Sequence, residues 1–283
     1  MLAFALGLSS SICWGLADFL GGTQARRVPL AAVMIVSQAT GLVGVAIYAA
    51  LSGEGSPGIV SLLPAAGGGA AGAIALTAFY RGLSIGTMSI VAPISATGAI
   101  VPVAVGIATG DRPGAVQVAG MAVAVVGVVL ASREGKNDDA AAAESSRLSI
   151  LLALVAALGF GSFFVGLHAS AGHSVLWSLV AARTSAFVLL GAGAIALRKE
   201  VRVAPAAALP LMLVGVLDLT ANTMFAIAST KGLLSLIAVL GSLYPVATVL
   251  LARALLGERV RRVQEAGIVL ALMGVALIAG GGA

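Results

Sequence analysis

The stretch GDRPGAVQVAGMAVAVVGVVLA, residues 110–131, returns 147 positions later as GERVRRVQEAGIVLALMGVALI, residues 257–278. In both copies a Gly, an acidic residue and an Arg precede an apolar run. The residues of the first copy that recur include Gly110, Arg112, Val116, Gln117, Ala119, Gly120, Ala124, Gly127 and Val128. A shift of 146 also pairs Trp14-Gly15 with Phe160-Gly161. Self-similarity at a fixed shift indicates a repeated structural unit, so we expect two related halves.

The composition on either side of these copies excludes an ordinary soluble protein. Of the 283 residues, 60% are apolar and 10% are charged, which leaves too few polar groups to solvate a globular surface. The apolar runs approach the roughly 20 residues that a helix needs to cross a bilayer. We therefore expect membrane helices near residues 2–23, 29–51, 62–81, 86–109, 114–132, 149–168, 174–197, 206–228, 233–256 and 263–280.

A polar stretch, residues 133–147, separates two groups of five predicted helices, residues 1–132 and 148–283. It is free of aromatic residues and mixed in charge, which is typical of a mobile linker. Because five is odd, the second group must begin on the opposite side of the membrane. The predicted fold is an all-α integral membrane protein with ten transmembrane helices in two inverted five-helix repeats. This architecture is frequent among secondary transporters, which bind their substrate between the halves.

The net charge of +5 does not indicate nucleic-acid binding, because the basic residues lie in short clusters between apolar runs. Most fall in the odd-numbered loops, which the positive-inside rule places in the cytosol together with anionic lipid head groups. We expect a multi-pass protein of the cell inner (plasma) membrane, whose partners are the lipid bilayer and a small-molecule substrate. The sequence leaves open whether it is a monomer or a homodimer.

Three segments resemble the EamA type of the drug/metabolite transporter superfamily. They are WGLADFLGGTQARR (14–27), VAPISATGAIVPV (91–103) and SLYPVATVLLARALLGER (242–259), and the resemblance extends over essentially the whole chain. It implies the ten-helix inverted repeat of that family, whose members move amino acids, sugars, drugs and other metabolites and usually lack an organic cofactor. It also implies cytosolic termini, whereas the loop charges predict the opposite orientation.

Ionisable residues inside the predicted helices are the best pointers to a functional site, because each is costly to place in lipid. These are Asp18, Arg183 and Asp218. One interpretation is that they bind a charged or zwitterionic substrate, with Asp18 and Asp218 as proton-coupling candidates. The alternative is a permanent ion pair between Arg183 and Asp218 that only holds two helices together. Asp18 has the further alternative of reaching water near its helix end.

Other residues complete the predicted site. Asn222 shares a helix face with Asp218, and Trp14 shares one with Asp18, because four residues make about one turn. Trp14 would form an apolar wall or, alternatively, anchor its helix at the membrane interface. The remaining substrate-binding candidates are polar residues that also have structural interpretations as helix-bridging groups: Gln38, Thr97, Thr184 and Tyr244. Hinges are expected at Pro93, Pro102 and Pro245, where the helix backbone lacks a donor.

The sequence predicts a secondary transporter, more specifically an exporter of a small metabolite such as an amino acid or a drug-like compound. Its cavity would lie between helices one, two, four, six, seven, eight and nine. We expect no catalytic residues, metal or cofactor, because His168 and His173 lack a third ligand nearby and the GxGxxG at residues 67–72 lacks its strand–turn–helix context. The alternatives are a membrane-embedded enzyme, and a membrane receptor or assembly protein without transport activity.

Overall fold

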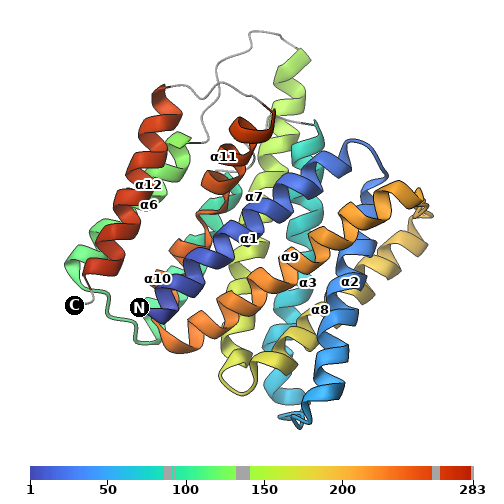
Figure 1. Cartoon of the computed structure of the whole chain (residues 1–283), viewed down its shortest axis with the longest axis horizontal. Coiled ribbons are helices and arrows are strands. Elements are labelled where there is room, and N and C mark those ends of the chain that lie inside the picture. The colour runs from blue at the N-terminus through green and yellow to red at the C-terminus, as the bar shows by residue number, and fades with distance from the viewer. Residues whose placement is uncertain (86–90, 92–93, 132–140, 257–261, 282–283) are drawn as a thin grey trace.

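The computed structural model describes residues 1–283 except 86–90, 92–93, 132–140, 257–261 and 282–283, and the described part is all helical (Figure 1). The first half contains α1 (Leu2–Ala25), α2 (Leu30–Ser52), α3 (Ile59–Ile85), η1 (Thr97–Ala99), α5 (Ile100–Thr109) and α6 (Ala115–Ala131). The second half contains α7 (Ala141–Ala171), α8 (Val175–Ala196), α9 (Pro205–Lys231), α10 (Leu234–Gly241), α11 (Tyr244–Leu256) and α12 (Arg262–Gly280).

Within this described part, six helical segments are long and apolar enough to cross a membrane: α1, α2, α3, residues 147–171 of α7, α8 and α9. Four more apolar segments are shorter, namely Ile94–Thr109, Ala115–Leu130, Leu234–Thr248 and Glu265–Ile278. Each of the ten predicted segments overlaps a helix or two consecutive helices, and residues 86–90 and 92–93 of the fourth segment lie outside the described part. The all-helical prediction is confirmed, and ten as the number of membrane crossings stays a prediction.

The fourth and ninth predicted helices are interrupted near their prolines. Pro102 follows the 3₁₀ segment η1, because a residue without N–H cannot bond to the carbonyl four residues earlier. Pro245 is the second residue of α11, where a helical N–H would lack a partner anyway, and a turn at residues 242–243 separates it from α10. Pro93 lies outside the described residues. The role of these positions as hinges stays a prediction.

The predicted linker, residues 133–147, is partly helical. Helix α7 begins at Ala141, so the last seven residues of that range continue into the first turns of a membrane helix. The run AAAESS explains the difference, since Ala and Glu favour helix and a following apolar helix lets them extend it. Polarity alone predicted a linker here, whereas the helix propensity of Ala and Glu decides the structure of residues 141–147.

Each main contact between the two halves has an equivalent when the halves are interchanged. Helix α3 packs along α7, and α1 packs along α9; α2 contacts α8, and α6 contacts α12 at one side of the bundle (Figure 1). The third predicted helix of each half packs against the first of the other half. The second helices of the two halves contact each other, and so do the fifth helices. This is the pattern expected of two equivalent units, although the inverted repeat and its boundaries stay predictions.

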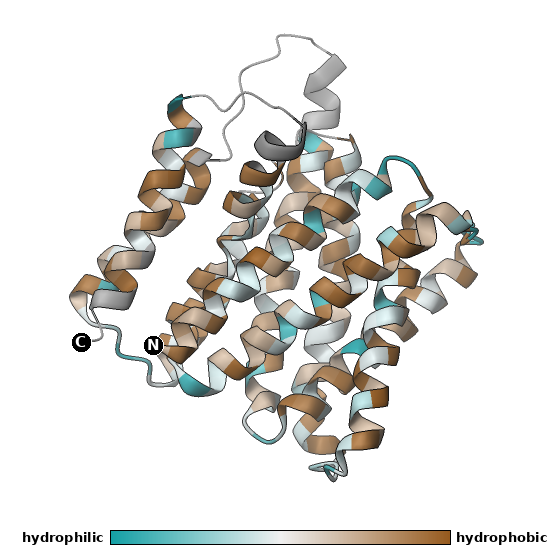
Figure 2. Ribbon diagram, in the orientation of Figure 1, coloured by the Kyte–Doolittle hydropathy of each residue, from teal (hydrophilic) through white to brown (hydrophobic). Residues whose placement is uncertain are grey.

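Hydrophobic residues occur along the helices throughout the bundle (Figure 2), and many large ones are exposed on its outside. Large exposed ones include Tyr48, Leu158 and Ile195. A surface of this kind is stable in hydrocarbon and unstable in water. With no hydrophobic driving force between helices in lipid, close van der Waals packing must hold the bundle together.

Glycines provide that close packing. On α6, a Cβ at Gly120 would lie 2.9 Å from the Gly274 carbonyl oxygen of α12, and one at Gly127 would overlap the backbone of Ala271. On α3, Gly69 has the same function, since a Cβ there would overlap the carbonyl of Ala182 on α8. Gly69 therefore sets the distance between α3 and α8, whereas Gly68 and Gly72 lie against Phe163 of α7.

Gly67 and Gly69 form a matched pair for testing this packing. A Cβ at Gly67 would meet no atom within 4 Å, so Gly67→Ala should leave stability unchanged or raise it through helix propensity. Gly69→Ala should lower the free energy of unfolding by about 1–3 kcal/mol, the usual cost of overpacking. Thermal unfolding in detergent measures both. Equal midpoints for the two variants would show that the approach of α3 to α8 is not tight.

Candidate functional site

A cavity lies at the centre of the bundle, between α1, α2, α3, α7, α8, α9 and the start of α11. Its volume is about 70 Å³ and part of it is continuous with the outside, so in this conformation it has room for a few water molecules and is smaller than most small-molecule sites. The prediction named the fourth helix as a wall. Among the described residues the wall includes Gly69, Gly72, Ala73 and Leu76 of the third helix and none of the fourth. The fourth helix as a wall stays a prediction, since part of it, residues 86–90 and 92–93, lies outside the described residues.

Arg183 of α8 is the centre of the polar lining. Its Nη1 donates to Oδ2 of Asp218 on α9 at 2.6 Å and to Oε1 of Gln38 on α2 at 2.8 Å. The Arg183 side chain is 5% exposed and that of Asp218 is 17% exposed. Gly41, nearly one turn after Gln38, makes room for the guanidinium, because a Cβ there would lie 3.3 Å from Arg183 Cζ. One buried cation thus connects three helices.

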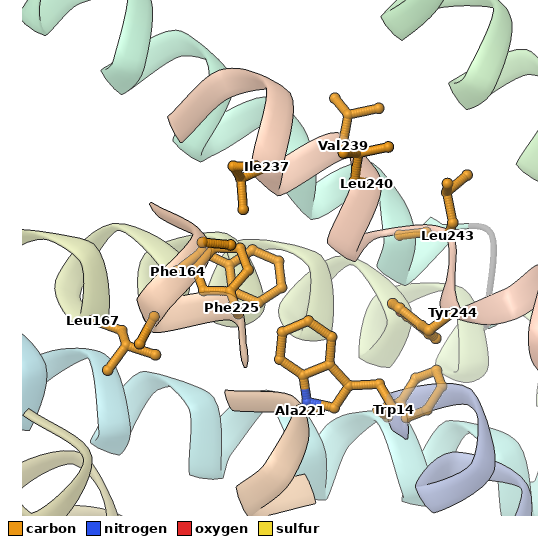
Figure 3. Close-up of a cluster of buried hydrophobic side chains, with 14 of the residues drawn as sticks. Trp14, Phe164, Leu167, Ala221, Phe225, Ile237, Val239, Leu240, Leu243 and Tyr244 are labelled. Carbon is orange, nitrogen blue, oxygen red and sulfur yellow. The ribbon is translucent and has the colours of Figure 1, made fainter. Parts of the chain in front are cut away.

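Asp218 also accepts a hydrogen bond from α1. Its Oδ1 lies 3.1 Å from Nε1 of Trp14, so both carboxylate oxygens are engaged. The Trp14 ring lies against Phe164 of α7 and Phe225 of α9, with ring centroids 5.3 and 5.8 Å away, and those two rings stack at 4.4 Å (Figure 3). The ion pair is therefore bordered by an aromatic wall, and Trp14 is buried in the interior of the bundle.

Asp18 has weaker partners than Asp218. The Tyr80 hydroxyl approaches its Oδ1 at 3.5 Å, longer than a normal O–H···O bond. Gly21 makes room for this hydroxyl, since a Cβ there would overlap it. Asp18 is 8% exposed, and no Lys, Arg or His in the described part of the chain forms an ion pair with it. A buried carboxyl in this setting is the group in the cavity least compensated by the protein.

Three buried polar atoms on the cavity wall lack a hydrogen-bond partner among the described residues: Arg183 Nη2, Asn222 Oδ1 and Tyr244 Oη. Native structures satisfy about nine in ten buried polar groups, and an unsatisfied one costs about 1–3 kcal/mol. The guanidinium N–H requires an acceptor, the Asn222 oxygen requires a donor, and the Tyr244 hydroxyl can use either. Together they leave both donor and acceptor capacity unused on the cavity wall.

The structure brings most of the predicted site residues to this one cavity. Its wall includes Trp14, Asp18, Gln38, Arg183, Asp218, Asn222 and Tyr244. Thr97 and Thr184 are absent from it. The Thr97 hydroxyl donates to the Ile94 carbonyl at 2.6 Å, and Thr184 is exposed on the outside of α8. Thr184 follows Arg183 directly, and adjacent residues of a helix point about 100° apart.

Several wall residues were not predicted. Phe160 and Phe163 extend the aromatic wall along α7, together with Phe164. Their signal in the sequence was the run FGSFF at residues 160–164, whose Phe160-Gly161 pair matches Trp14-Gly15 in the repeat. The two matched positions lie on the same cavity, so the repeat itself pointed to both walls.

This fold and site define a multi-helical membrane protein with a buried polar cavity, and the comparisons with known proteins agree. Residues 147–280 match the model of the EamA-like transporter family. The second half of the chain is therefore an EamA-like unit, of the EamA type of the drug/metabolite transporter superfamily, and the protein is a multi-pass membrane protein. The EamA family is a transporter family and not an enzyme family.

Solved structures add evidence for the fold. One described as "Crystal structure of protein" matches 97% of this chain and 95% of its own, with a TM-score of 0.73 and 18% sequence identity. At this identity the likeness shows a shared fold. Comparison with curated proteins gives no match.

The buried pair gives a stability prediction. Arg183→Leu leaves Asp218 without its cation and should lower the free energy of unfolding by about 3 kcal/mol. The double variant Arg183→Leu/Asp218→Leu should be destabilised by clearly less than the two single changes added together, because neither charge remains buried alone. Thermal unfolding of the four proteins in detergent measures this coupling, and additive effects would show that the pair is not energetically linked.

Proposed function

We propose that this protein is a secondary transporter, specifically an exporter of a small metabolite across the cell inner (plasma) membrane. Its two halves expose the central cavity to one side and then to the other. The observation that carries the proposal is the set of three unpaired buried polar atoms on one cavity wall, Arg183 Nη2, Asn222 Oδ1 and Tyr244 Oη. Such atoms are stable when a bound solute or water completes their hydrogen bonds.

The chemistry of the wall indicates the kind of solute. Arg183 offers N–H groups to a carboxylate or another acceptor, whereas the Asn222 oxygen and the Asp18 carboxylate favour an amine or another donor. Trp14 and Phe163 provide an apolar surface for the rest of the molecule. An amino acid or a drug-like amine with an apolar part fits these requirements.

The two carboxyl groups have different roles in this proposal. Asp218 is held by Arg183 and Trp14 and organises the site. Asp18 has no ion-pair partner among the described residues and can exchange a proton or bind an amine without disrupting the polar centre. We therefore assign proton coupling to Asp18 in preference to Asp218.

Transport into proteoliposomes tests the proposal, after a thermal-shift screen of amino acids, sugars, nucleosides and cationic drugs has found a stabilising solute. Asn222→Leu and Tyr244→Phe should each reduce the initial rate of uptake about tenfold, since each removes a hydrogen bond of about 1–1.5 kcal/mol or blocks the wall. Thr184→Ala is the control, because this side chain is exposed outside the cavity.

In the same vesicles, Asp18→Asn should abolish accumulation driven by a pH gradient and keep exchange of labelled for unlabelled solute. If Asn222→Leu and Tyr244→Phe both retain the wild-type rate and solute preference while folded, the cavity is not the transport site. If Asp18→Asn still accumulates solute with the pH gradient, Asp18 does not carry the proton.

A further inference from the structure

A second cavity opens on the outer face of the bundle, where α2, α3, α7 and α8 meet. Along α3 it extends from Ala73 to Arg81, and its other walls include Leu152, Val155 and Leu190. The polar side chains in its wall are Thr77 and Arg81, and the Thr77 hydroxyl is satisfied by the Ala73 carbonyl at 2.8 Å. Arg81 is thus the wall's one charged side chain. We call this cavity the outer groove.

The guanidinium of Arg81 is exposed at one end of the outer groove. The ion pairs formed among the described residues are Arg183–Asp218 and Arg202–Glu200, and neither involves Arg81. An unpaired cation at the end of an apolar channel attracts an anion joined to an apolar chain. The molecule that binds here must therefore combine an anionic group with an apolar chain.

Other basic residues lie at the same end of the bundle. Arg26 and Arg27 are exposed just before Leu30, which lines the groove at the start of α2. Arg147 is exposed five residues before Leu152 on α7. Helices α3 and α7 are antiparallel, since Gly68 faces Gly166 whereas Gly82 faces Leu152, so Arg147 lies toward the same end as Arg81. This end carries a concentration of positive charge.

The dimensions of the groove match one lipid chain. From Ala73 to Arg81 the helix rises about 12 Å at 1.5 Å per residue, close to the roughly 15 Å depth of one leaflet of a bilayer core. The neighbouring exposed residues of this face, such as Ile74 and Leu189, are apolar, so acyl chains are the molecules that surround it.

We propose that the outer groove binds an anionic phospholipid, with one acyl chain along α3 and the phosphate on Arg81. The surrounding arginines favour a lipid with net negative charge over a zwitterionic one, because the positive potential at this end attracts the former and has little net effect on the latter. A free phosphate would use Arg81 alone and would not need the apolar channel.

Native mass spectrometry of the full chain in detergent tests this proposal, with dioleoylphosphatidylglycerol and dioleoylphosphatidylcholine as probes. The anionic lipid should be retained several-fold more than the zwitterionic one. Arg81→Gln should lower retention of the anionic lipid about fivefold, the usual effect of one basic residue at a membrane surface. Arg202→Gln is the matched control, since Arg202 is 92% exposed in the loop before α9.

A second pair of variants tests the chain-binding part of the groove. Val155→Trp fills the groove and should reduce retention of both lipids, whereas Val216→Trp, at an exposed position of α9, should not. Excess inorganic phosphate should not displace the lipid. Equal retention of the two lipids, an equal loss in Arg81→Gln and Arg202→Gln, or displacement by phosphate would each overturn the proposal.

Discussion

The buried guanidinium of Arg183 is the constraint on which the arrangement of the helices depends. A cation in the middle of an apolar bundle is stable only if protein groups replace its water. Asp218 from α9 and Gln38 from α2 do so, and Trp14 from α1 engages the second oxygen of Asp218. The hydrogen bonds around this single cation therefore fix the positions of α1, α2, α8 and α9 relative to one another. The glycine at position 41 shows how closely the backbone has adapted to it.

This constraint also explains why the cavity can be polar inside a bundle that is apolar throughout. The hydrogen bonds of Arg183 Nη1 satisfy its partners, while its Nη2, together with Asn222 and Tyr244, stays unpaired on the cavity wall. The protein thus compensates part of the polar centre and leaves part of it without a partner among the described residues. The aromatic wall of α1, α7 and α9 limits how much water shares the space (Figure 3). Such partial compensation is what the proposed binding site requires and a purely structural ion pair does not.

Sequence reasoning located the helices and the central charges well, and for a physical reason. The length of an apolar run and the presence of an ionisable residue within it are set by the bilayer, so they are visible without tertiary contacts. The partner of Arg183 was predictable for the same reason. The side of a helix that faces the cavity was not, because Thr184 and Arg183 are neighbours with opposite exposure. The third helix was not predicted to line the cavity because its glycines have no side chain that would mark a site. Close approach between helices also leaves no signal in hydropathy.

The central claim is that one polar cavity becomes open to each side of the membrane in turn, and cysteine accessibility tests it most directly. Ala186 is buried on the cavity wall, and Ala186→Cys in a Cys13→Ser background would be the one thiol of the chain. With a membrane-impermeant maleimide applied to either face of proteoliposomes, the account predicts labelling from both sides and a change in their ratio when solute is added. Labelling from one side alone, with and without solute, would contradict it.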